Sequence, residues 1–248
     1  MRIKLVKVRI LPFLSKKIRV LDLRDSNSFR YRNALLISDI HCRNYCKPLK
    51  IILNLAERRK YDVVIILGDL LDDSHKPANK STIVHLLSKT LGGEKLNIEL
   101  IYVLSTASHD PLLPRPYLLS GEIAKKLVVS PYPVALRVDQ FSLFLTHGEI
   151  IVKSGALAHI INLVLGKLGV ELAIEKIMKR SLMACFADEW LIAAHTHIPG
   201  LDFEYKVGNT GNWRLMWQRK IRYWKPPTYS LIEISKKGIR LIRLNKGC

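Results

Sequence analysis

The 248-residue chain predicts a mixed α/β fold, and two patterns along it indicate this class. Short apolar runs rich in β-branched residues alternate with segments whose apolar residues recur at helical spacing. In the first half the order is strand, helix, strand, helix, strand, which is typical of parallel strands covered by helices. Ligands and catalytic groups in such sheets lie beyond the carboxyl ends of the strands, so we expect any site there.

The predicted elements follow one another without an internal repeat or a low-complexity linker. The N-terminal part predicts a half-exposed strand and then a polar connection or edge hairpin, at residues 2–10 and 19–32. Buried strands then alternate with helices, at residues 33–41, 47–60, 61–73, 80–93 and 97–111. The second half predicts a hairpin, a helical segment and three further stretches of strand, at residues 135–149, 151–188, 190–200, 205–213 and 228–244.

The simplest domain organisation is one domain over residues 1–248. Residues 151–188, which are helical and strongly apolar, would form a helical insertion or cap. Residues 1–32 would form a basic N-terminal extension.

Composition limits the class of protein. The chain is 48% apolar and 25% charged, which is typical of a globular protein. No stretch reaches the roughly 18 uninterrupted apolar residues of a membrane span, and lysines and arginines interrupt the apolar residues of the N-terminus, which argues against a signal peptide. We therefore expect a cytoplasmic protein whose four cysteines, which show no CxxC pair, are reduced thiols.

The formal net charge of +19 predicts an anionic partner or substrate. Basic residues concentrate in residues 1–33 and in residues 213–248, where Glu233 is the single acid. A phosphate-containing substrate, a nucleic acid and peripheral contact with an anionic membrane all satisfy this charge. A merely solubilising surface is the alternative.

Carboxylates and imidazoles follow five of the apolar runs. The strand ends carry Asp39 with His41, Asp69, His109 with Asp110, His147, and His195 with His197. Residues two apart in an extended chain point to the same side, so the pairs Asp39/His41 and His195/His197 can each converge on one point. Carboxylate and imidazole ligands suit divalent ions such as Mn²⁺, Zn²⁺ and Fe²⁺.

The segments "SDIH", "GDLLD", "SHD", "THG" and "AHTHIPG" in this order resemble the calcineurin-like metallophosphoesterase family over roughly residues 33–212. The resemblance implies a β-sandwich flanked by helices, with two metal ions in the loops. One ion would be held by Asp39, His41, Asp69 and His197. The other would be held by Asp69, Ser108, His147 and His195, so that Asp69 bridges the two.

The same resemblance implies the reaction. A hydroxide bridging the two metals would attack phosphorus, and two ions can also offset the charge of the phosphoryl group. His109 would stabilise the developing charge or protonate the leaving oxygen, and Asp110 would orient His109 by accepting its other ring proton. The sequence departs from the family pattern where it has Ser108 in place of asparagine, Ala107 in place of the glycine before it, and Ala194 in place of glycine.

The natural phosphoester stays open between several alternatives. "HTHIP" followed by "VGNTGNW" resembles a branch that includes the UDP-diacylglucosamine pyrophosphate hydrolases. A nuclease is the alternative enzyme, because aromatic residues on which bases could stack lie among the C-terminal basic residues: Trp213, Trp217, Tyr223, Trp224 and Tyr229. A non-catalytic binding module is the third reading. Arg43 and Arg115 are candidates to hold a phosphate that does not react.

Overall fold

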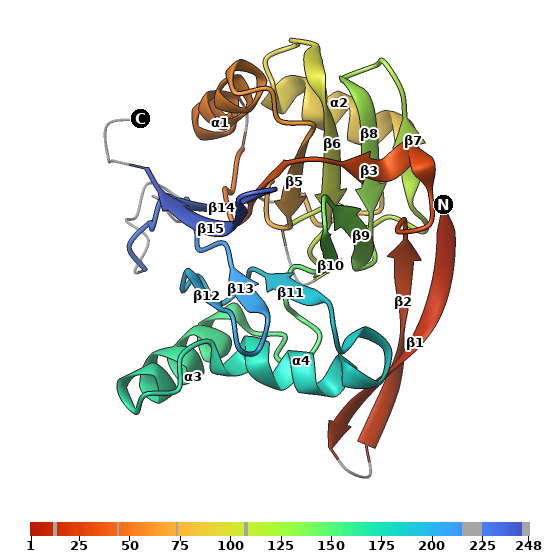
Figure 1. The fold of residues 1–248 in the computed structure, drawn as a ribbon. Coiled ribbons are helices and arrows are strands. Elements are labelled where there is room, and N and C mark those ends of the chain that lie inside the picture. Colours follow the sequence, from red (N-terminus) through yellow and green to blue (C-terminus); the bar gives the residue numbers. More distant parts are fainter. Residues whose placement is uncertain (12–13, 44, 73, 107–108, 215–224, 245–248) are drawn as a thin grey trace.

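Two β-sheets pack face to face in the middle of the molecule, with helices on their outer faces (Figure 1). The computed structural model describes residues 1–11, 14–43, 45–72, 74–106, 109–214 and 225–244. Within these residues the chain forms two sheets and four α-helices, so the predicted mixed α/β class is confirmed.

The first sheet contains the parallel strands predicted from the first half of the sequence. From one edge to the other its strands are β15 (Gly238–Arg243), β14 (Ser230–Ser235), β4 (Ala34–Ile37), β5 (Val63–Leu67), β6 (Leu96–Val103), β8 (Ala124–Ser130) and β7 (Tyr117–Leu119). β4, β5, β6 and β8 are parallel to one another, and antiparallel strands close both edges.

The second sheet is built from the N-terminal hairpin and the second half of the chain. In order its strands are β1 (Arg2–Leu11), β2 (Leu14–Asp22), β9 (Val134–Val138), β10 (Phe141–Leu145), β11 (Trp190–Ala193), β13 (Val207–Asn209) and β12 (Gly200–Asp202). The short strand β3 (Arg30–Tyr31), which follows the 3-10 turn η1 (Asn27–Phe29), also pairs with β9.

Alternation along the buried strands divides the apolar core. In β5, Val63, Ile65 and Leu67 face the second sheet, whereas Val64 and Ile66 face the helices. The helices on that side are α1 (Lys47–Arg58) and α2 (Lys80–Thr90). Strands buried on both faces read as continuous apolar runs, which explains why the sequence showed them so clearly.

The outer face of the second sheet, which includes the hairpin of β1 and β2, is covered by α4 (Ala173–Phe186). The helix before it, α3 (Gly155–Lys167), packs against α4 and lies at the outside of the molecule (Figure 1). Both helices lie within residues 151–188, the predicted insertion; the division into insertion and domain stays a prediction. No helix in the described part of the chain is long and apolar enough to cross a membrane.

Candidate metal centre

Loops that follow β4, β5 and β11 bring carboxylates and imidazoles to one end of the two sheets. At five positions in these loops a residue other than glycine has a left-handed backbone, with φ of 51°, 56°, 49°, 69° and 63° at Asp39, His41, Asp69, His195 and His197. Such a conformation costs on the order of 1 kcal/mol or more per residue and is concentrated in proteins at functional sites. Five of the residues that the sequence pattern selected therefore have this strained backbone.

Backbone hydrogen bonds fix the loop of Asp39 against the loop of Asp69. The amides of Ile40 and His41 both donate to the carbonyl of Asp69, each at 2.9 Å. Gly68 precedes Asp69 with φ of +74°, and a Cβ there would lie 2.4 Å from Nδ1 of His147. Glycine is thus required both by the turn and by the close approach of the His147 ring.

Asp39, His41, Asp69 and His197 lie close together and are almost fully buried. Nε2 of His197 is 3.0 Å from Oδ1 of Asp39, and Nε2 of His41 is 3.6 Å from Oδ2 of Asp69. The side chains of His41 and His197 are 2% and 6% exposed. These four residues are the set that the family resemblance assigns to one ion.

His147 and His195 meet Asp69 from the second sheet. Nε2 of His147 is 3.7 Å from Oδ2 of Asp69, and Nδ1 of His195 is 3.3 Å from that same Nε2. The other ring nitrogens contact backbone carbonyls, Nδ1 of His147 at Leu67 and Nε2 of His195 at Val152. A ring nitrogen that donates to a carbonyl leaves the other nitrogen as an acceptor, which is how metal-binding histidines are oriented.

The cluster fits divalent metal ions. Ligand atoms of Asp39, His41 and His197 lie within 4.8 Å of one another, and so do those of Asp39, Asp69 and His147. Among the described residues, neither ring nitrogen of His41 nor Oδ1 of Asp69 has a hydrogen-bond partner, although all three atoms are buried. Buried polar atoms without partners are costly, and a cation bound between them removes that cost.

Electrostatics within the cluster are strongly coupled. Burial lowers the pKa of His147, but the carboxylates of Asp69, Asp39 and Glu149 outweigh it and raise that pKa to about 9. Burial, reinforced by the neighbouring His147, lowers the pKa of His195 to about 4. Burial raises the pKa of Asp39, but His197, His147 and His41 reverse this, so the carboxylate stays ionised. A divalent ion requires ionised carboxylates and neutral imidazoles, so Asp39 and His195 already have the state that ligands need, whereas His147 would release a proton when an ion binds.

Glu149 joins the cluster although the sequence prediction left it out. Its Oε1 lies 3.5 Å from Nε2 of His147, and ligand atoms of His147, Glu149 and His195 also lie within 4.8 Å of one another. Oε2 of Glu149 accepts a hydrogen bond from the amide of Thr106 at 2.7 Å. The spacing of Glu149 two residues after His147 was the signal, because it is the spacing that paired Asp39 with His41.

Asp72, and not Asp110, is the carboxylate beside His109. Oδ1 of Asp72 is 3.3 Å from Nδ1 of His109 and 3.6 Å from Nδ1 of His41. Burial lowers the pKa of His109, but contact with Asp72 outweighs it and raises that pKa. The expected orientation of His109 by Asp110 is therefore wrong.

Asp110 instead turns into the protein and stabilises the loops. Its carboxylate accepts hydrogen bonds from the amides of Asp69 at 2.8 Å, Ser105 at 2.9 Å and Leu71 at 3.3 Å, and from the hydroxyl of Tyr102. Burial, together with the charge of Asp69, raises the pKa of Asp110 to about 6. Its role is to connect the end of β6 to the loop of Asp69.

The remaining predicted residues divide into three cases. Arg43 lies at the cluster, where its Nε donates to Asp72 at 3.0 Å. Arg115 lies elsewhere, beside Tyr117 in a surface pocket that also contains Lys80 and Glu122. Ser108 falls outside the described residues.

Two buried cations near the cluster were also missed. Nη2 of Arg214 is 3.2 Å from Oδ1 of Asp72, and Nζ of Lys225 donates to the carbonyl of Gly155 at 3.1 Å. Burial lowers the pKa of Lys225 to about 8. Neither residue belongs to a strand-end motif, so the sequence offered no signal beyond the general basic character of the C-terminal part.

The expectation of reduced thiols is wrong for two of the cysteines. Cys42 and Cys46 form a disulfide with their Cα atoms 5.5 Å apart, between the loop of His41 and the start of α1. The turn into the helix brings the two residues together, and a spacing of four residues belongs to no recognised framework. Cys185 on α4 is a free thiol, and Cys248 lies outside the described residues.

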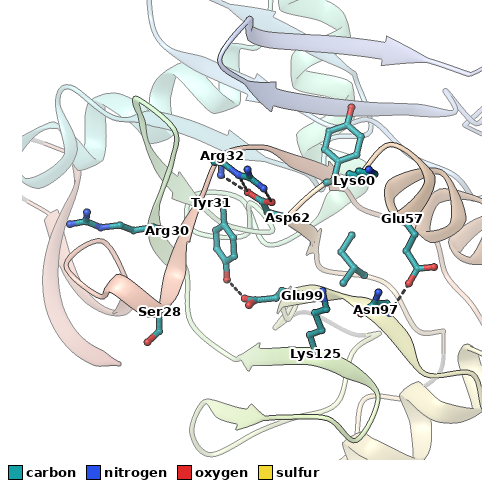
Figure 2. Close-up of a pocket in the computed structure, with 12 residues that line it drawn as sticks. Ser28, Arg30, Tyr31, Arg32, Glu57, Lys60, Asp62, Asn97, Glu99 and Lys125 are labelled. Atoms are coloured by element: carbon teal, nitrogen blue, oxygen red, sulfur yellow. Dashed lines mark hydrogen bonds and ion pairs between the residues drawn. The ribbon is translucent and has the colours of Figure 1, made fainter.

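A separate cavity of about 560 Å³ lies at the opposite ends of the strands (Figure 2). Its wall contains residues that precede β4 and β5, whereas the cluster of carboxylates and imidazoles lies in loops that follow the strands. The acids there already have partners: Arg32 bonds to Asp62, and the hydroxyl of Tyr31 donates to Glu99 at 2.9 Å. These contacts are consistent with a structural role for this end of the sheet.

Several solved structures are similar to the chain at low sequence identity. Among solved structures, a predicted phosphoesterase from Streptococcus pneumoniae is 14% identical over 87% of this chain and 94% of its own, with a TM-score of 0.41. Yfce, a phosphoesterase from E. coli, is 17% identical over 87% and 95%, with a TM-score of 0.45. An anchor protein of the inner membrane complex of Plasmodium is 13% identical over 84% and 82%, with a TM-score of 0.43.

No curated protein matches the sequence. The family model for calcineurin-like phosphoesterases matches residues 33–229, a span that contains every strand-end motif described above. The chain therefore belongs to the calcineurin-like phosphoesterase family.

Proposed function

We propose that this chain is a metal-dependent phosphoesterase that hydrolyses a phosphodiester or pyrophosphate bond at a site of two divalent metal ions. The ions would be Mn²⁺, Zn²⁺ or Fe²⁺. The observation that carries the proposal is the convergence of two carboxylates and four imidazoles on one buried point. Within the described residues, buried polar atoms of His41 and Asp69 have no hydrogen-bond partner there. Membership of the phosphoesterase family supports the reaction class.

The division of ligands between the two ions is the one that the family resemblance implies, and the contacts within the cluster support it. Asp39, His41, Asp69 and His197 would hold one ion, and Asp69, His147 and His195 would hold the other. Glu149 is close enough to His147 to supply an oxygen ligand to the second ion, which would compensate for a weak ligand at Ser108. When bound, two ions offset the charge of the phosphoryl group and lower the pKa of the attacking water.

His109 would act on the substrate from the rim of the site. Its side chain is 23% exposed, whereas those of His41 and His147 are 2% and 3% exposed, so its ring can reach an incoming phosphoester. The raised pKa of His109 favours the protonated ring, which can stabilise the developing charge or donate a proton to the leaving oxygen.

Turnover of bis(4-nitrophenyl) phosphate with added Mn²⁺ tests this proposal. We expect Asp69→Asn to reduce kcat by at least about a thousandfold, because it removes the carboxylate shared by both ions. Asp139→Asn is the matched control, since Asp139 is exposed in the turn between β9 and β10 and the same charge is removed. Absence of turnover by the unaltered protein with every divalent ion would favour the binding-module alternative instead.

For the substrate, we propose an amphiphilic phosphoester of the kind that the resemblance to UDP-diacylglucosamine pyrophosphate hydrolases implies. Large apolar side chains of α3 and the turn after it are exposed, namely Leu157, Ile160, Leu163, Val164, Leu168 and Val170. An exposed apolar surface of this kind marks an interaction site. Hydrolysis of UDP-linked lipids, compared with that of short-chain analogues, measures whether the apolar part of the substrate contributes.

The nuclease alternative has less support. Trp213 is 4% exposed and packs edge-to-face on Tyr229 at 5.7 Å, so the ring of Trp213 offers no free face as a platform for bases. Trp217, Tyr223 and Trp224 lie outside the described residues. Labelled DNA and RNA belong in the same substrate panel, and their cleavage in preference to lipids would reverse this ranking.

We also propose that α3 contacts an anionic membrane surface peripherally. Its apolar residues are flanked by the exposed Lys153 and Lys167, and the whole chain carries a net charge of +19. A second copy of the chain would carry the same positive charge and would be repelled, whereas anionic headgroups attract it. The predicted cytoplasmic location stays a prediction.

A further inference from the structure

A pocket of about 290 Å³ adjoins the metal cluster on the side of the N-terminal hairpin. One wall of the pocket belongs to the cluster and its loops, through Thr106, His147 and Glu149. The opposite wall belongs to β2, through Lys16, Ile18 and Arg19.

Three cations line this pocket, and their charges are not neutralised there. Nζ of Lys16 donates to the carbonyl of Ile150 at 2.5 Å, and Nη1 of Arg19 donates to the hydroxyl of Tyr132 at 3.0 Å, so both partners are neutral. Lys153 is the third cation, and its positive charge repels that of Lys16.

The acid of the pocket is engaged elsewhere. Among the described residues that line it, Glu149 is the acidic one, and its carboxylate contacts Thr106 and faces His147. Three cations against this one carboxylate leave the pocket with an excess of positive charge, and a bound anion would offset that charge. The pocket thus has the charge to take an anion next to the cluster.

The hairpin that supplies Lys16 and Arg19 lies outside the span that the family model matches. The family match begins at residue 33, after both strands of the hairpin. The amide of Leu21 donates to the carbonyl of Pro133 at 2.8 Å, and β2 pairs with β9. Val8 and Val20 pack into the core beneath α4. The hairpin is therefore fixed in place and holds its cations at a defined position.

We propose that this pocket binds a second phosphate of the substrate while the reacting phosphoester lies at the metal cluster. The preferred substrate then carries a further phosphoryl group in addition to the one that reacts. Its organic part would pack against the apolar wall formed by Val103, Leu104 and Pro133. This inference rests on the proposed phosphoesterase function and specifies its substrate class.

Adenosine 3′,5′-bisphosphate and adenosine 5′-monophosphate are matched probes, because they differ by one phosphate. Each is titrated into the Mn²⁺-loaded protein by calorimetry and is also tested as an inhibitor of bis(4-nitrophenyl) phosphate hydrolysis. We expect the bisphosphate to bind about tenfold more tightly than the monophosphate, since a charge-assisted contact contributes about this factor.

Variants distinguish binding of the second phosphate in this pocket from attraction by the general positive charge of the protein. Lys16→Met and Lys153→Met should each remove most of the preference for the bisphosphate. Arg19→Gln provides a third, independent substitution. Lys17→Met is the matched control, because Lys17 is exposed on the same strand, is absent from the pocket wall and carries the same charge. Melting temperatures confirm that each variant is folded.

Two results would overturn the inference: equal affinity of the unaltered protein for the two nucleotides, or an equal loss of preference in Lys17→Met and Lys16→Met. Failure of the phosphoesterase proposal is a different result, namely no turnover with any divalent ion. Calorimetry still measures the bisphosphate preference in that case, so the two failures are distinguishable.

Discussion

Asp72 contacts several charged side chains of the site at once. Its carboxylate lies near the rings of His41 and His109, and it also pairs with Arg43 and Arg214. We expect Asp72→Asn to lower kcat by roughly 10- to 100-fold, the usual effect of removing a carboxylate that orients catalytic or metal-binding histidines. Kinetics with bis(4-nitrophenyl) phosphate measure this.

Asp110→Asn should behave differently and serves as the comparison. Asparagine has a single acceptor oxygen, so some donors among the amides of Asp69, Leu71 and Ser105 lose their partner, at a cost of about 1–3 kcal/mol of unfolding free energy. The melting temperature should fall by several degrees. A loss of kcat equal to that of Asp72→Asn, with no loss of stability, would restore Asp110 as the partner of His109.

The proposed role of Glu149 as a metal ligand can be tested by measuring metal content. If Glu149 supplies a ligand to the second ion, Glu149→Gln should lower the metal content of the purified protein from about two ions toward one, because a neutral amide binds divalent cations more weakly. Elemental analysis reads this directly. Glu204→Gln, at an exposed position, should keep two ions; an unchanged content in both variants would remove Glu149 from the site.

The sequence predicted the residues that cluster but not all of their contacts. Asp39, Asp69, His147 and the pair at His195 each follow an apolar run, and parallel strands end at a common edge, so their meeting could be predicted. The partner of Asp110 could not, because it depends on amides of a loop some 40 residues away in the chain. Arg115 was misplaced for the same reason, since nearness in sequence to a motif does not fix the direction of a loop.

At the scale of the element, a buried lysine in the middle of α4 reaches the carbonyl groups at the end of that helix. Nζ of Lys179 donates to the carbonyls of Phe186, at 2.7 Å, and of Glu189. The residue is 6% exposed, and burial lowers its pKa from 10.5 to about 8. A base whose pKa is lower in the folded state destabilises the fold while it is charged, so this penalty is complete below pH 8.

The pH dependence has a defined sign. Between pH 8 and pH 10.5 the unfolded chain holds more protons at this position than the folded chain, so stability rises with pH through this window. Relative to Lys179→Met, the unaltered protein should gain about 3 kcal/mol of unfolding free energy between pH 7 and pH 10.5. Urea unfolding of both proteins measures the difference; a constant difference across the window would contradict it.

The elements themselves were largely predictable, and their docking was not. The run that became β5 is continuously apolar, β6 is apolar throughout its second half, and the spacing in α1 is clearly helical, so the type of each element followed from the sequence pattern. The pairing of β2 with β9 joins segments that are more than 110 residues apart in the chain. This pairing brings Lys16 to the pocket beside the candidate metal site. Local patterns do not specify contacts at that separation.

For the whole molecule, the net charge and the exposed apolar surface of α3 together predict binding to anionic membranes. The protein should co-sediment with vesicles that contain phosphatidylglycerol and not with vesicles of phosphatidylcholine alone. Leu168 is 73% exposed, and Leu168→Glu should weaken vesicle binding by at least about tenfold, because it removes an apolar contact and adds a repelled charge.

The control for vesicle binding is Leu118→Glu. Leu118 is 43% exposed on β7, at the far edge of the first sheet, and should not touch the membrane. A second copy of the chain is the competing occupant of the α3 surface. A dimeric mass in sedimentation that becomes monomeric in Leu168→Glu, together with no vesicle binding, would assign the surface to self-association.

The left-handed backbone at Asp39, His41, Asp69, His195 and His197 bears on when the site takes shape during folding. An unfolded chain rarely visits this conformation at one such residue and almost never at five together. The arrangement therefore depends on both sheets being in place, and a metal ion bound there would enter an enclosure that the fold has already built.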